Sequence, residues 1–464
     1  MEKIEEICNT ISESYLNKAG INYKERIYYL KKLEMVILDQ KVNIQNALFQ
    51  DLRKSSFETD ATEIFTVLTE IRHCLRNLHH WVRHTAVLTP IPMIGTSSYI
   101  IPEPKGMVLI IAPWNYPFNL CISPLLSAIA AGNRVLIKPS EFCPHTAEIL
   151  KKIVDVVFPK DVVAVINGDY SVAEALVKLP FHHIFYTGSS RVGKLIMAAA
   201  AENLTSITLE LGGKSPCIID VSFSIQLAAE RIAFAKFINA GQTCIAPDFV
   251  LLPKAKIKQF IDCFNTVVDK MLGESKLQSK EYTGIINSKH FNRLHTLWSA
   301  ACETEGYDYT LDSDASRLKI KPTCIQIEKW SNPIMNEEIF GPILPVIGYE
   351  DLQASIAVLN QFHRPLNLYI FSNNDSMINH ILKQTRSGGV TINECLLNYC
   401  NNNLPFGGDG NSGLGKTHGK FGFDVFSHFR AVTKQSKLPS GLLFFYPPYT
   451  PLKNKIKDLL VKYF

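Results

Sequence analysis

Several features that would place the chain in a class of protein at once are missing from its sequence. No stretch reaches the ~20 apolar residues needed to span a bilayer. The N-terminus has neither the basic start nor the apolar core of a secretory signal. The eleven cysteines contain no CxxC pair and no zinc-site spacing, so we expect no metal site and no disulfide framework. A reducing, cytoplasmic location is the simplest expectation.

Dense runs of one charge are missing as well. The 48 Lys and Arg residues against 43 Asp and Glu give a formal net charge of +5, which is mild for 464 residues. Because no basic run resembles a nucleic-acid footprint, we expect no nucleic-acid partner. The hydrophobic content of 46% is that of a globular chain. The length predicts two or three domains at roughly 100–200 residues each.

The sequence does contain an alternation of helical and strand patterns. Residues 1–85 carry apolar residues at helical spacing. From residue 106 onward, short apolar runs alternate with helical stretches of roughly 10–15 residues. The first four runs are 107–112, 134–138, 162–166 and 182–186. Strands that are apolar throughout predict a parallel sheet with helices on both faces, a doubly wound α/β fold. The same alternation begins again after residue 220.

The turn after the fourth apolar run is the most nucleotide-like in the chain. Gly188, Ser189 and Gly193 fit the G-x-x-x-x-G-K spacing of a phosphate-binding loop. Leu195, however, stands where that loop requires a Mg²⁺-binding Ser or Thr, which disfavours a P-loop NTPase. The turn therefore fits either a nucleotide site at a helix N-terminus or a tight strand-to-helix turn.

Three polar residues follow other predicted strands, at the sheet edge where doubly wound folds bind ligands. Lys138 and Glu141 could hydrogen-bond ribose hydroxyls, or they could be solvated strand-end residues. The amide of Asn115 could donate to a developing oxyanion, although Asn is also common in ordinary turns.

Two residues in the second half suggest covalent chemistry. Cys244 follows a helix on a polar turn, where backbone N–H groups can stabilise a thiolate, although an ordinary loop cysteine fits the spacing too. Glu210 lies between two leucines at the end of a strand, which predicts a raised pKa suited to a general base. It could instead pair with Lys214. A hydrolase that uses Cys244 with His418 is the rival hypothesis, although a lone His in a Gly-rich loop is usually exposed or structural.

Taken together, seven stretches resemble the aldehyde dehydrogenase superfamily, specifically its class 3 branch. They occur in the family's order from about residue 100 to 435. The Cys-centred and Glu-centred stretches are the most specific. The seven are APWNYPFNL (112–120), GNRVLIKPSE (132–141), FYTGSSRVGK (185–194), LELGGKSPCIID (209–220), FINAGQTCIAPDFVL (237–251), NEEIFGPILPV (336–346) and LPFGGDGNSGLGKTHGKFGFDVFSHFRAV (404–432).

The resemblance implies a role for each matched position. Cys244 matches the family's nucleophile, Glu210 its base and Asn115 its oxyanion-hole asparagine. The positions that match its cofactor site, for NAD or NADP, are Lys138 and Glu141 at the ribose, Gly188, Ser189 and Gly193 at the pyrophosphate, and Glu338 and Phe340 at the nicotinamide. A family member that is catalytically silent is a further alternative, although every matched catalytic position holds the expected residue.

The implied reaction is the oxidation of an aldehyde, long-chain aliphatic or aromatic, to a carboxylic acid. The cysteine forms a thiohemiacetal, hydride passes to the nicotinamide, and the base activates water to hydrolyse the thioester. The implied architecture has a Rossmann-like cofactor domain, a catalytic domain, a β bridging element that mediates a homodimer, and a tail. We assign these to residues 1–82 with 107–210, to 211–402, to 83–106 with 403–440, and to 441–464.

The chain departs from the family pattern at two positions and in its tail. Asn367 stands in an apolar strand, and Asp409 stands where a small apolar residue is usual, so local packing or substrate access is in doubt. Residues 452–464 place apolar side chains on one helical face with lysines around it. That face could give weak peripheral contact with a membrane or pack on protein.

Overall fold

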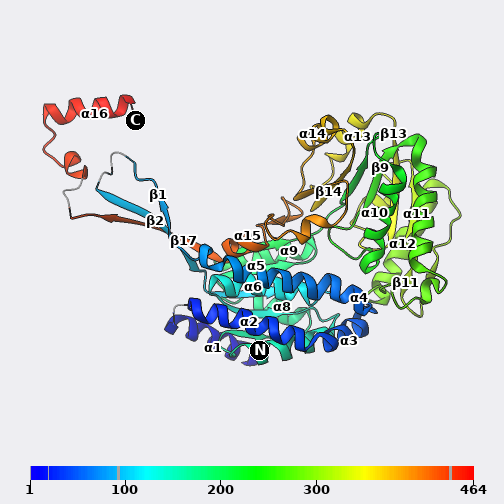
Figure 1. Cartoon of the computed structure of the whole chain (residues 1–464), viewed down its shortest axis with the longest axis horizontal. Helices are drawn as coiled ribbons and strands as arrows, with labels where there is room; N and C mark the ends of the chain where they lie inside the picture. The colour runs from blue at the N-terminus through cyan, green and yellow to red at the C-terminus, as the bar shows by residue number, and fades with distance from the viewer. Residues whose placement is uncertain (1, 19, 91–92, 94, 438–440, 464) are drawn as a thin grey trace.

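The computed structural model describes residues 2–18, 20–90, 93, 95–437 and 441–463. Two α/β lobes lie side by side, and a long arm reaches away from the N-terminal lobe (Figure 1). Each lobe has a six-stranded sheet, and the arm has a three-stranded sheet. The doubly wound fold expected from the apolar runs is confirmed.

The N-terminal lobe is built on a sheet with the strand order β16-β7-β6-β3-β4-β5. Five strands are parallel, and β16 adds an antiparallel edge to β7. All four apolar runs form buried strands because both faces of the sheet are covered. The strands are β3 (Met107–Ile111), β4 (Arg134–Lys138), β5 (Val163–Val165), β6 (His183–Thr187), β7 (Ser206–Glu210) and β16 (Gly413–Leu414).

Helices cover both faces of this sheet. One apolar cluster joins the sheet to α2, α3, α5, α6 and α7, and a second joins it to α1, α8 and α9. A π-helical turn, η1, runs directly into α5. The elements are α1 (Glu2–Lys18), α2 (Tyr23–Asp39), α3 (Lys41–Leu52), α4 (Ser56–Thr59), η1 (Asp60–Ile64), α5 (Phe65–Trp81), α6 (Asn119–Ala131), α7 (Pro144–Val157), α8 (Tyr170–Val177) and α9 (Ser190–Glu202).

The second lobe has a fully parallel sheet with the order β12-β13-β9-β8-β14-β15. Its strands are β8 (Pro216–Ile219), β9 (Phe249–Pro253), β12 (Thr323–Ile327), β13 (Ile343–Tyr349), β14 (Asn367–Phe371) and β15 (Gly389–Ile392), with a separate hairpin of β10 (Ser313–Asp314) and β11 (Lys319–Ile320). Its helices are α10 (Ile225–Phe237), α11 (Ile257–Leu272), α12 (Ser288–Glu305), α13 (Leu352–Leu359) and α14 (Asp375–Gln384), with short turns η3 (Ile238–Gly241), η4 (Lys254–Lys256), η5 (Lys276–Gln278) and η6 (Pro333–Met335).

The residues expected to form one bridging element divide between two places. β16 joins the N-terminal sheet, and α15 (Gly419–Val425) packs on α5 and α6. The arm itself consists of β1 (Thr85–Val87), β2 (Thr96–Pro104) and β17 (Ser427–Gln435), paired antiparallel. Between the second lobe and β16 lies the short turn η7 (Leu397–Cys400).

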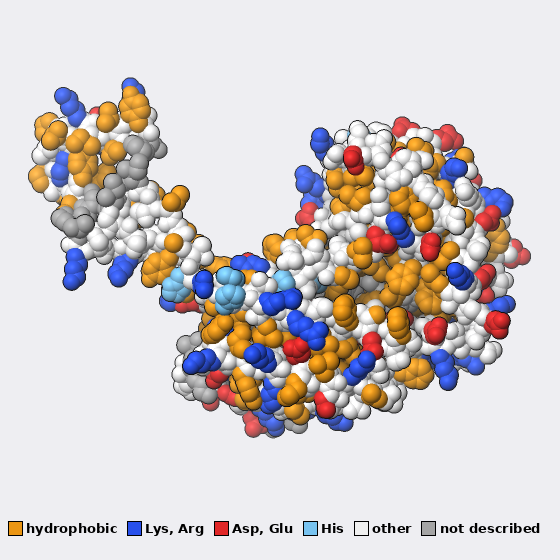
Figure 2. Space-filling view, viewed as in Figure 1, with side chains coloured by type: hydrophobic (Ala, Val, Ile, Leu, Met, Phe, Trp, Pro, Cys, Tyr) orange, Lys and Arg blue, Asp and Glu red, His pale blue; other side chains and the backbone are white. Residues whose placement is uncertain are grey.

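The tail forms the end of the arm. After the turn η8 (Gly441–Phe445), the helix expected near the C-terminus is present as α16 (Pro451–Tyr463). Hydrophobic side chains and lysines both lie on its surface (Figure 2). Among the described residues, none of the helices has the length and apolarity to cross a membrane.

Candidate active site

The three predicted catalytic residues meet in one cavity between the lobes. This cofactor-side cavity has a volume of about 440 Å³ and is lined by Asn115, Glu210 and Cys244. Asn115 follows β3, Glu210 is the last residue of β7, and Cys244 follows η3. The carboxyl ends of parallel strands share one edge of a sheet, which brings Asn115 and Glu210 together, and the turn after η3 brings Cys244 to them from the second lobe.

The turn before Cys244 has an unusual backbone. Asn239 and Ala240 are left-handed, with φ of 52° and 50°, and Gly241 has φ of 69°. A Cβ on Gly241 would lie 2.4 Å from the carbonyl oxygen of Gly341, so no other residue fits there. Two consecutive non-glycine residues in this region store strain that the surrounding contacts must hold. Cys244 therefore sits on a turn whose shape depends on its neighbours.

Side-chain amides tie this turn to the Asn115 loop. Asn239 Nδ2 donates to the carbonyl oxygens of Asn115 and Gln242, both at 2.9 Å. Gln242 Nε2 donates back to the Asn239 carbonyl and to that of Gly284, each at 3.0 Å. Asn115 Nδ2 donates to the Gln242 carbonyl at 3.1 Å, which leaves its second N–H for a ligand. These bonds hold Asn115, the candidate oxyanion-hole residue, beside the turn that carries Cys244.

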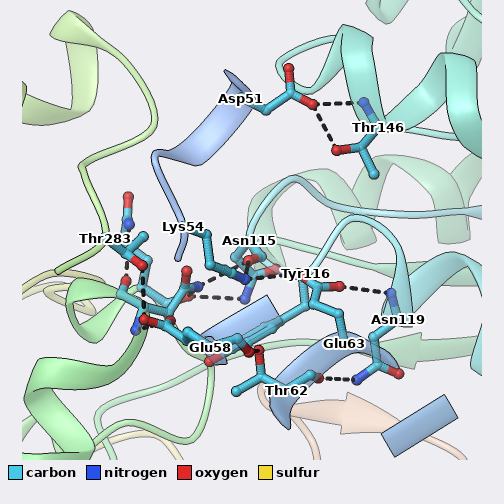
Figure 3. A network of polar contacts seen from close by, with 12 residues as sticks. Asp51, Lys54, Glu58, Thr62, Glu63, Asn115, Tyr116, Asn119, Thr146 and Thr283 are labelled. Carbon is cyan, nitrogen blue, oxygen red and sulfur yellow. Dashed lines mark hydrogen bonds and ion pairs between the residues drawn. The ribbon is translucent and has the colours of Figure 1, made fainter. Parts of the chain in front are cut away.

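A buried ion pair supports the Asn115 loop from behind (Figure 3). Lys54 Nζ lies 2.7 Å from Glu63 Oε1, and both side chains are fully buried. The same ammonium donates to the Asn115 carbonyl at 3.4 Å and lies 4.3 Å from the centre of the Tyr116 ring. Glu63 also accepts from the backbone N–H of Asn119, at the start of α6. One cation thus joins α3, η1 and the loop after β3.

A second buried carboxylate holds the cysteine turn. Glu58 accepts from the backbone N–H of Asn239 at 2.7 Å and from the Thr283 hydroxyl at 2.9 Å (Figure 3). Burial raises the pKa of Glu58, and Lys54 opposes that shift. Sequence reasoning missed Lys54, Glu58 and Glu63. The signal was there, as charged residues among apolar ones in a segment with a helical period.

Glu210 has the environment that its leucine neighbours predicted. Neither carboxylate oxygen has a hydrogen-bond partner within the described residues, and both are buried. Burial therefore raises the pKa of Glu210 well above its usual range, and Lys416 offsets only part of the shift. The alternative pairing with Lys214 is wrong, because Lys214 forms its ion pair with Asp248 instead.

The Cys244 thiol is less activated than its turn suggested. Burial raises its pKa, and the carboxylates of Glu338 and Glu210 raise it further. The backbone N–H groups of Cys244 and Ile245 lower the pKa, as expected from the turn, but they do not dominate. The site by itself therefore favours the thiol.

The residues predicted for the cofactor fall into two groups. Gly188, Ser189, Glu338 and Phe340 line the same cavity as Cys244. Ser189 caps the N-terminus of α9 by accepting from the backbone N–H of Val192. Phe340 packs edge-to-face on Trp114, with ring centres 5.3 Å apart. Burial raises the pKa of Glu338 to about 8.

The other three lie outside that cavity. Gly193 is inside α9, where a Cβ would lie 3.0 Å from Leu211 Cδ2, so it brings the helix close to the sheet. Lys138 Nζ and Glu141 Oε2 form an ion pair of 2.6 Å at the end of β4. Lys138 is buried and Glu141 is more exposed.

A second, mostly apolar cavity of about 240 Å³ reaches Cys244 from another side. Its lining includes Tyr116, Leu120, Phe234, Ile238, Leu396 and Tyr399. It shares Ala61, Thr66, Tyr399 and Cys400 with an outer groove of about 620 Å³. Cys244 thus lies where a polar, helix-capped cavity meets an apolar passage.

Comparison with known proteins identifies the family. The sequence model described as "Aldehyde dehydrogenase family" matches residues 2–432. The chain belongs to the aldehyde dehydrogenase family. It is therefore an oxidoreductase that oxidises aldehydes, as the resemblance implied.

Relatives with full-length matches place it within that family. The 4,4'-diaponeurosporen-aldehyde dehydrogenase of Staphylococcus aureus (strain NCTC 8325 / PS 47) is 41% identical and covers 92% of each chain. The dimeric NADP-preferring aldehyde dehydrogenase of Mus musculus is 39% identical, over 94% of this chain and 95% of that one. A substrate-bound state of Staphylococcus aureus AldH is 39% identical with a TM-score of 0.94, covering 98% and 99%.

The two departures from the aldehyde dehydrogenase pattern are accommodated locally. Asn367 is fully buried in β14, but its Oδ1 accepts from Asn398 Nδ2 at 2.8 Å, so its polar group is satisfied. Asp409 forms an ion pair of 2.8 Å with Arg364 near the surface. Neither residue lines a cavity that contains Cys244.

His418, the partner in the rival hydrolase reading, has a different setting. It is buried, and burial lowers its pKa to about 4. Its Nδ1 lies 2.8 Å from the Thr417 hydroxyl, and its ring packs on Tyr399 and Phe406. A weakly basic imidazole engaged in this way is a poor base for a cysteine.

Proposed function

We propose that this aldehyde dehydrogenase converts medium- or long-chain aliphatic or aromatic aldehydes to carboxylic acids with NAD or NADP, through a thioester on Cys244. The observation that carries the proposal is the position of Cys244. It lies at the junction of the cofactor-side cavity and the apolar passage. One sulfur atom can therefore reach both an aldehyde and a nicotinamide.

The residues of the cofactor-side cavity fit a nicotinamide dinucleotide. The first turn of α9 offers backbone N–H groups and the positive end of a helix dipole to a diphosphate, directly after Gly188. Trp114 and Phe340 give the inner end of the cavity aromatic walls. Lys138 and Glu141, at the neighbouring strand end, offer an ammonium and a carboxylate to a ribose. Bound there, the oxidised nicotinamide supplies the acceptor for a hydride.

The side chains of the chain perform the remaining chemistry. The Cys244 sulfur attacks the aldehyde carbon to form a thiohemiacetal. The free amide hydrogen of Asn115 and the backbone N–H of Cys244 hold the oxyanion. After oxidation, Glu210 accepts a proton from water, whose oxygen attacks the thioester carbon. A carboxylate with a raised pKa and no hydrogen-bond partner is suited to that task.

The substrate class follows from the shape and chemistry of the passage. The apolar cavity and the outer groove together extend from the sulfur to the surface, and most of the surface that lines them is apolar. Asp60 and Glu70 bring carboxylates to the outer part. Such a passage favours a long apolar chain or an aromatic ring over a phosphorylated or otherwise anionic aldehyde, which the carboxylates would repel.

The test is a panel of aliphatic and aromatic aldehydes assayed with NAD⁺ and with NADP⁺, following absorbance of the reduced cofactor. Cys244→Ala should abolish activity. Glu210→Gln should retain a first-turnover burst, while its steady-state rate falls about 100-fold. Ester cleavage by the wild-type protein without any aldehyde-dependent reduction of cofactor would overturn the proposal in favour of a hydrolase.

A homodimer completes the proposed function. The relative from Mus musculus is named dimeric, and the arm of this chain exposes apolar side chains on its outer strands, including Val87 and Phe429. A sheet with two open edges is a template for further strand pairing. We place the contact between two copies on this arm.

A further inference from the structure

A third, smaller cavity lies behind the active site. We call it the inner chamber; its volume is about 40 Å³, and Glu210, Cys244, Glu70, Ser123, Tyr399 and His418 are among its lining residues. Since one water needs about 10–15 Å³ of such space, the chamber has room for about three molecules. The two Glu210 oxygens, buried and without partners in the described part of the chain, can be hydrogen-bonded from this side.

The far wall of the inner chamber is also a wall of the outer groove. Glu70, Ser123, Tyr399 and His418 line both the chamber and the groove of about 620 Å³. The groove reaches solvent, since Phe57 on its rim is exposed. Glu70 therefore lies in the partition between the catalytic base and bulk water, and it does not line the cofactor-side cavity.

The proposed hydrolysis leaves a proton that has to move. The water O–H bond breaks, the oxygen bonds to the acyl carbon, and the C–S bond breaks with its electron pair returning to Cys244. The proton remains on Glu210, which cannot accept another until it has been deprotonated. The cofactor-side cavity also borders Glu210, but a dinucleotide bound there would block this exit.

We propose that Glu70 is a proton-relay residue, which takes the proton from Glu210 through water in the inner chamber and releases it into the outer groove. This inference rests on the proposed function, since it needs Glu210 to act as the base. The relay is a net transfer of one proton per turnover and uses no other reactant. Ser123 lines the inner chamber together with Glu70, and its hydroxyl donates to Asn119 Oδ1 at 2.9 Å.

The ionisation of Glu70 suits a relay near neutral pH. The side chain is buried in α5, and burial raises its pKa to about 7, with the Ser123 hydroxyl opposing the shift. Such a carboxylate accepts a proton at pH 7 and gives it up again with little free-energy change.

The titratable groups around Glu70 do not compete with it. On its own helix, burial raises the pKa of Cys74 and lowers that of His73. From the packed segments, burial lowers the pKa of His418 to about 4 and raises that of Tyr399 well above its usual range, and the Glu70 charge raises it further. Near pH 7, therefore, these four stay uncharged, and Glu70 is the member of this group that changes its protonation.

The experiment compares Glu70→Gln with wild type in stopped flow and steady state, using an aldehyde that the wild type oxidises. Glutamine keeps the shape of the side chain but accepts no proton. The burst of reduced cofactor should keep its rate and amplitude, because it precedes hydrolysis, while the steady-state rate falls about tenfold. Glu174→Gln, at an exposed carboxylate on α8, is the matched control and should match wild type.

Two further readouts separate a relay from a structural role. The wild-type steady-state rate should rise with pH through about 7 as Glu70 ionises, and this rise should be smaller in Glu70→Gln. Added formate, small enough for the outer groove, should restore turnover of the variant and leave wild type unchanged. A Glu70→Gln protein with full burst and wild-type turnover at every pH, or one that formate does not rescue, would overturn the relay alone. A wild type without aldehyde-dependent cofactor reduction would overturn the proposed function.

Discussion

At the scale of single residues, Cys244 stands in a field that opposes its ionisation. Two acidic side chains, Glu338 and Glu210, lie near the sulfur, and burial removes the water that would stabilise a thiolate. A thiol in this environment needs a nearby positive charge to ionise. An oxidised nicotinamide would supply one if it bound in the cofactor-side cavity, which Cys244 lines. Cofactor binding and reaction with the aldehyde are therefore coupled through the ionisation of the Cys244 sulfur.

Alkylation of Cys244 by iodoacetamide should report this coupling. Because burial raises the pKa of the thiol, the thiolate fraction at neutral pH is small, and the alkylation rate should rise about tenfold per pH unit between pH 6 and 8. Adding NAD⁺ should increase the rate at pH 7. Mass spectrometry of the Cys244 peptide follows the reaction, with the exposed Cys400 as an internal reference. A flat pH dependence would show that the thiol is already ionised.

At the scale of elements, the sequence predicted the strands better than it predicted the buried polar networks. The runs that became β3, β4 and β6 were legible because a strand buried on both faces is apolar throughout. Cys244 and Glu210 were singled out from their local sequence, but their catalytic roles came from the family resemblance, because each residue alone also fitted an ordinary structural role. Lys54 and Glu63 were not singled out, because a charge in a helical segment reads as solvated until the packing of another element buries it. The unsatisfied Glu210 oxygens depend in the same way on tertiary structure.

The Lys54–Glu63 pair joins three elements, and its removal should cost stability. Lys54→Met leaves Glu63 as an unpaired buried carboxylate and removes the charge that offsets Glu58, so we expect a loss of about 3–5 kcal/mol in the free energy of unfolding. Urea unfolding followed by circular dichroism measures it. The comparison is Lys178→Met, which breaks an exposed pair with Glu174 and should cost less than about 1 kcal/mol.

The double variant Lys54→Met with Glu63→Leu separates the stability cost of an unpaired charge from the role of the ion pair in positioning Asn115. Replacing both buried charges by apolar groups should recover much of the lost stability, because neither charge is left unpaired. Its kcat should nevertheless stay below wild type, since the ammonium no longer holds the Asn115 carbonyl. Full recovery of both quantities would show that the pair has no part in positioning Asn115.

At the scale of the whole molecule, the arm is the feature that a monomer does not explain. It stands away from both lobes (Figure 1) and carries apolar side chains on its surface (Figure 2). All three residues of β1 are exposed, as is most of β17, so the outer strands of the arm are covered by nothing in the described part of this chain. Building and exposing such a sheet costs conformational entropy and apolar hydration that packing within one chain does not return.

A second copy of the chain can supply the missing cover. Light scattering during size-exclusion chromatography should give a mass twice the 52.2 kDa of one chain. Leu88→Glu with Phe429→Glu, at two exposed apolar positions of the arm, should shift the mass to that of one chain, because each buried charge costs several kcal/mol. Leu195→Glu, at an exposed position on the N-terminal lobe, is the matched control and should stay a dimer. If the arm variant kept the double mass, the contact between copies would have to lie on the lobes, and the exposed strands would need another partner.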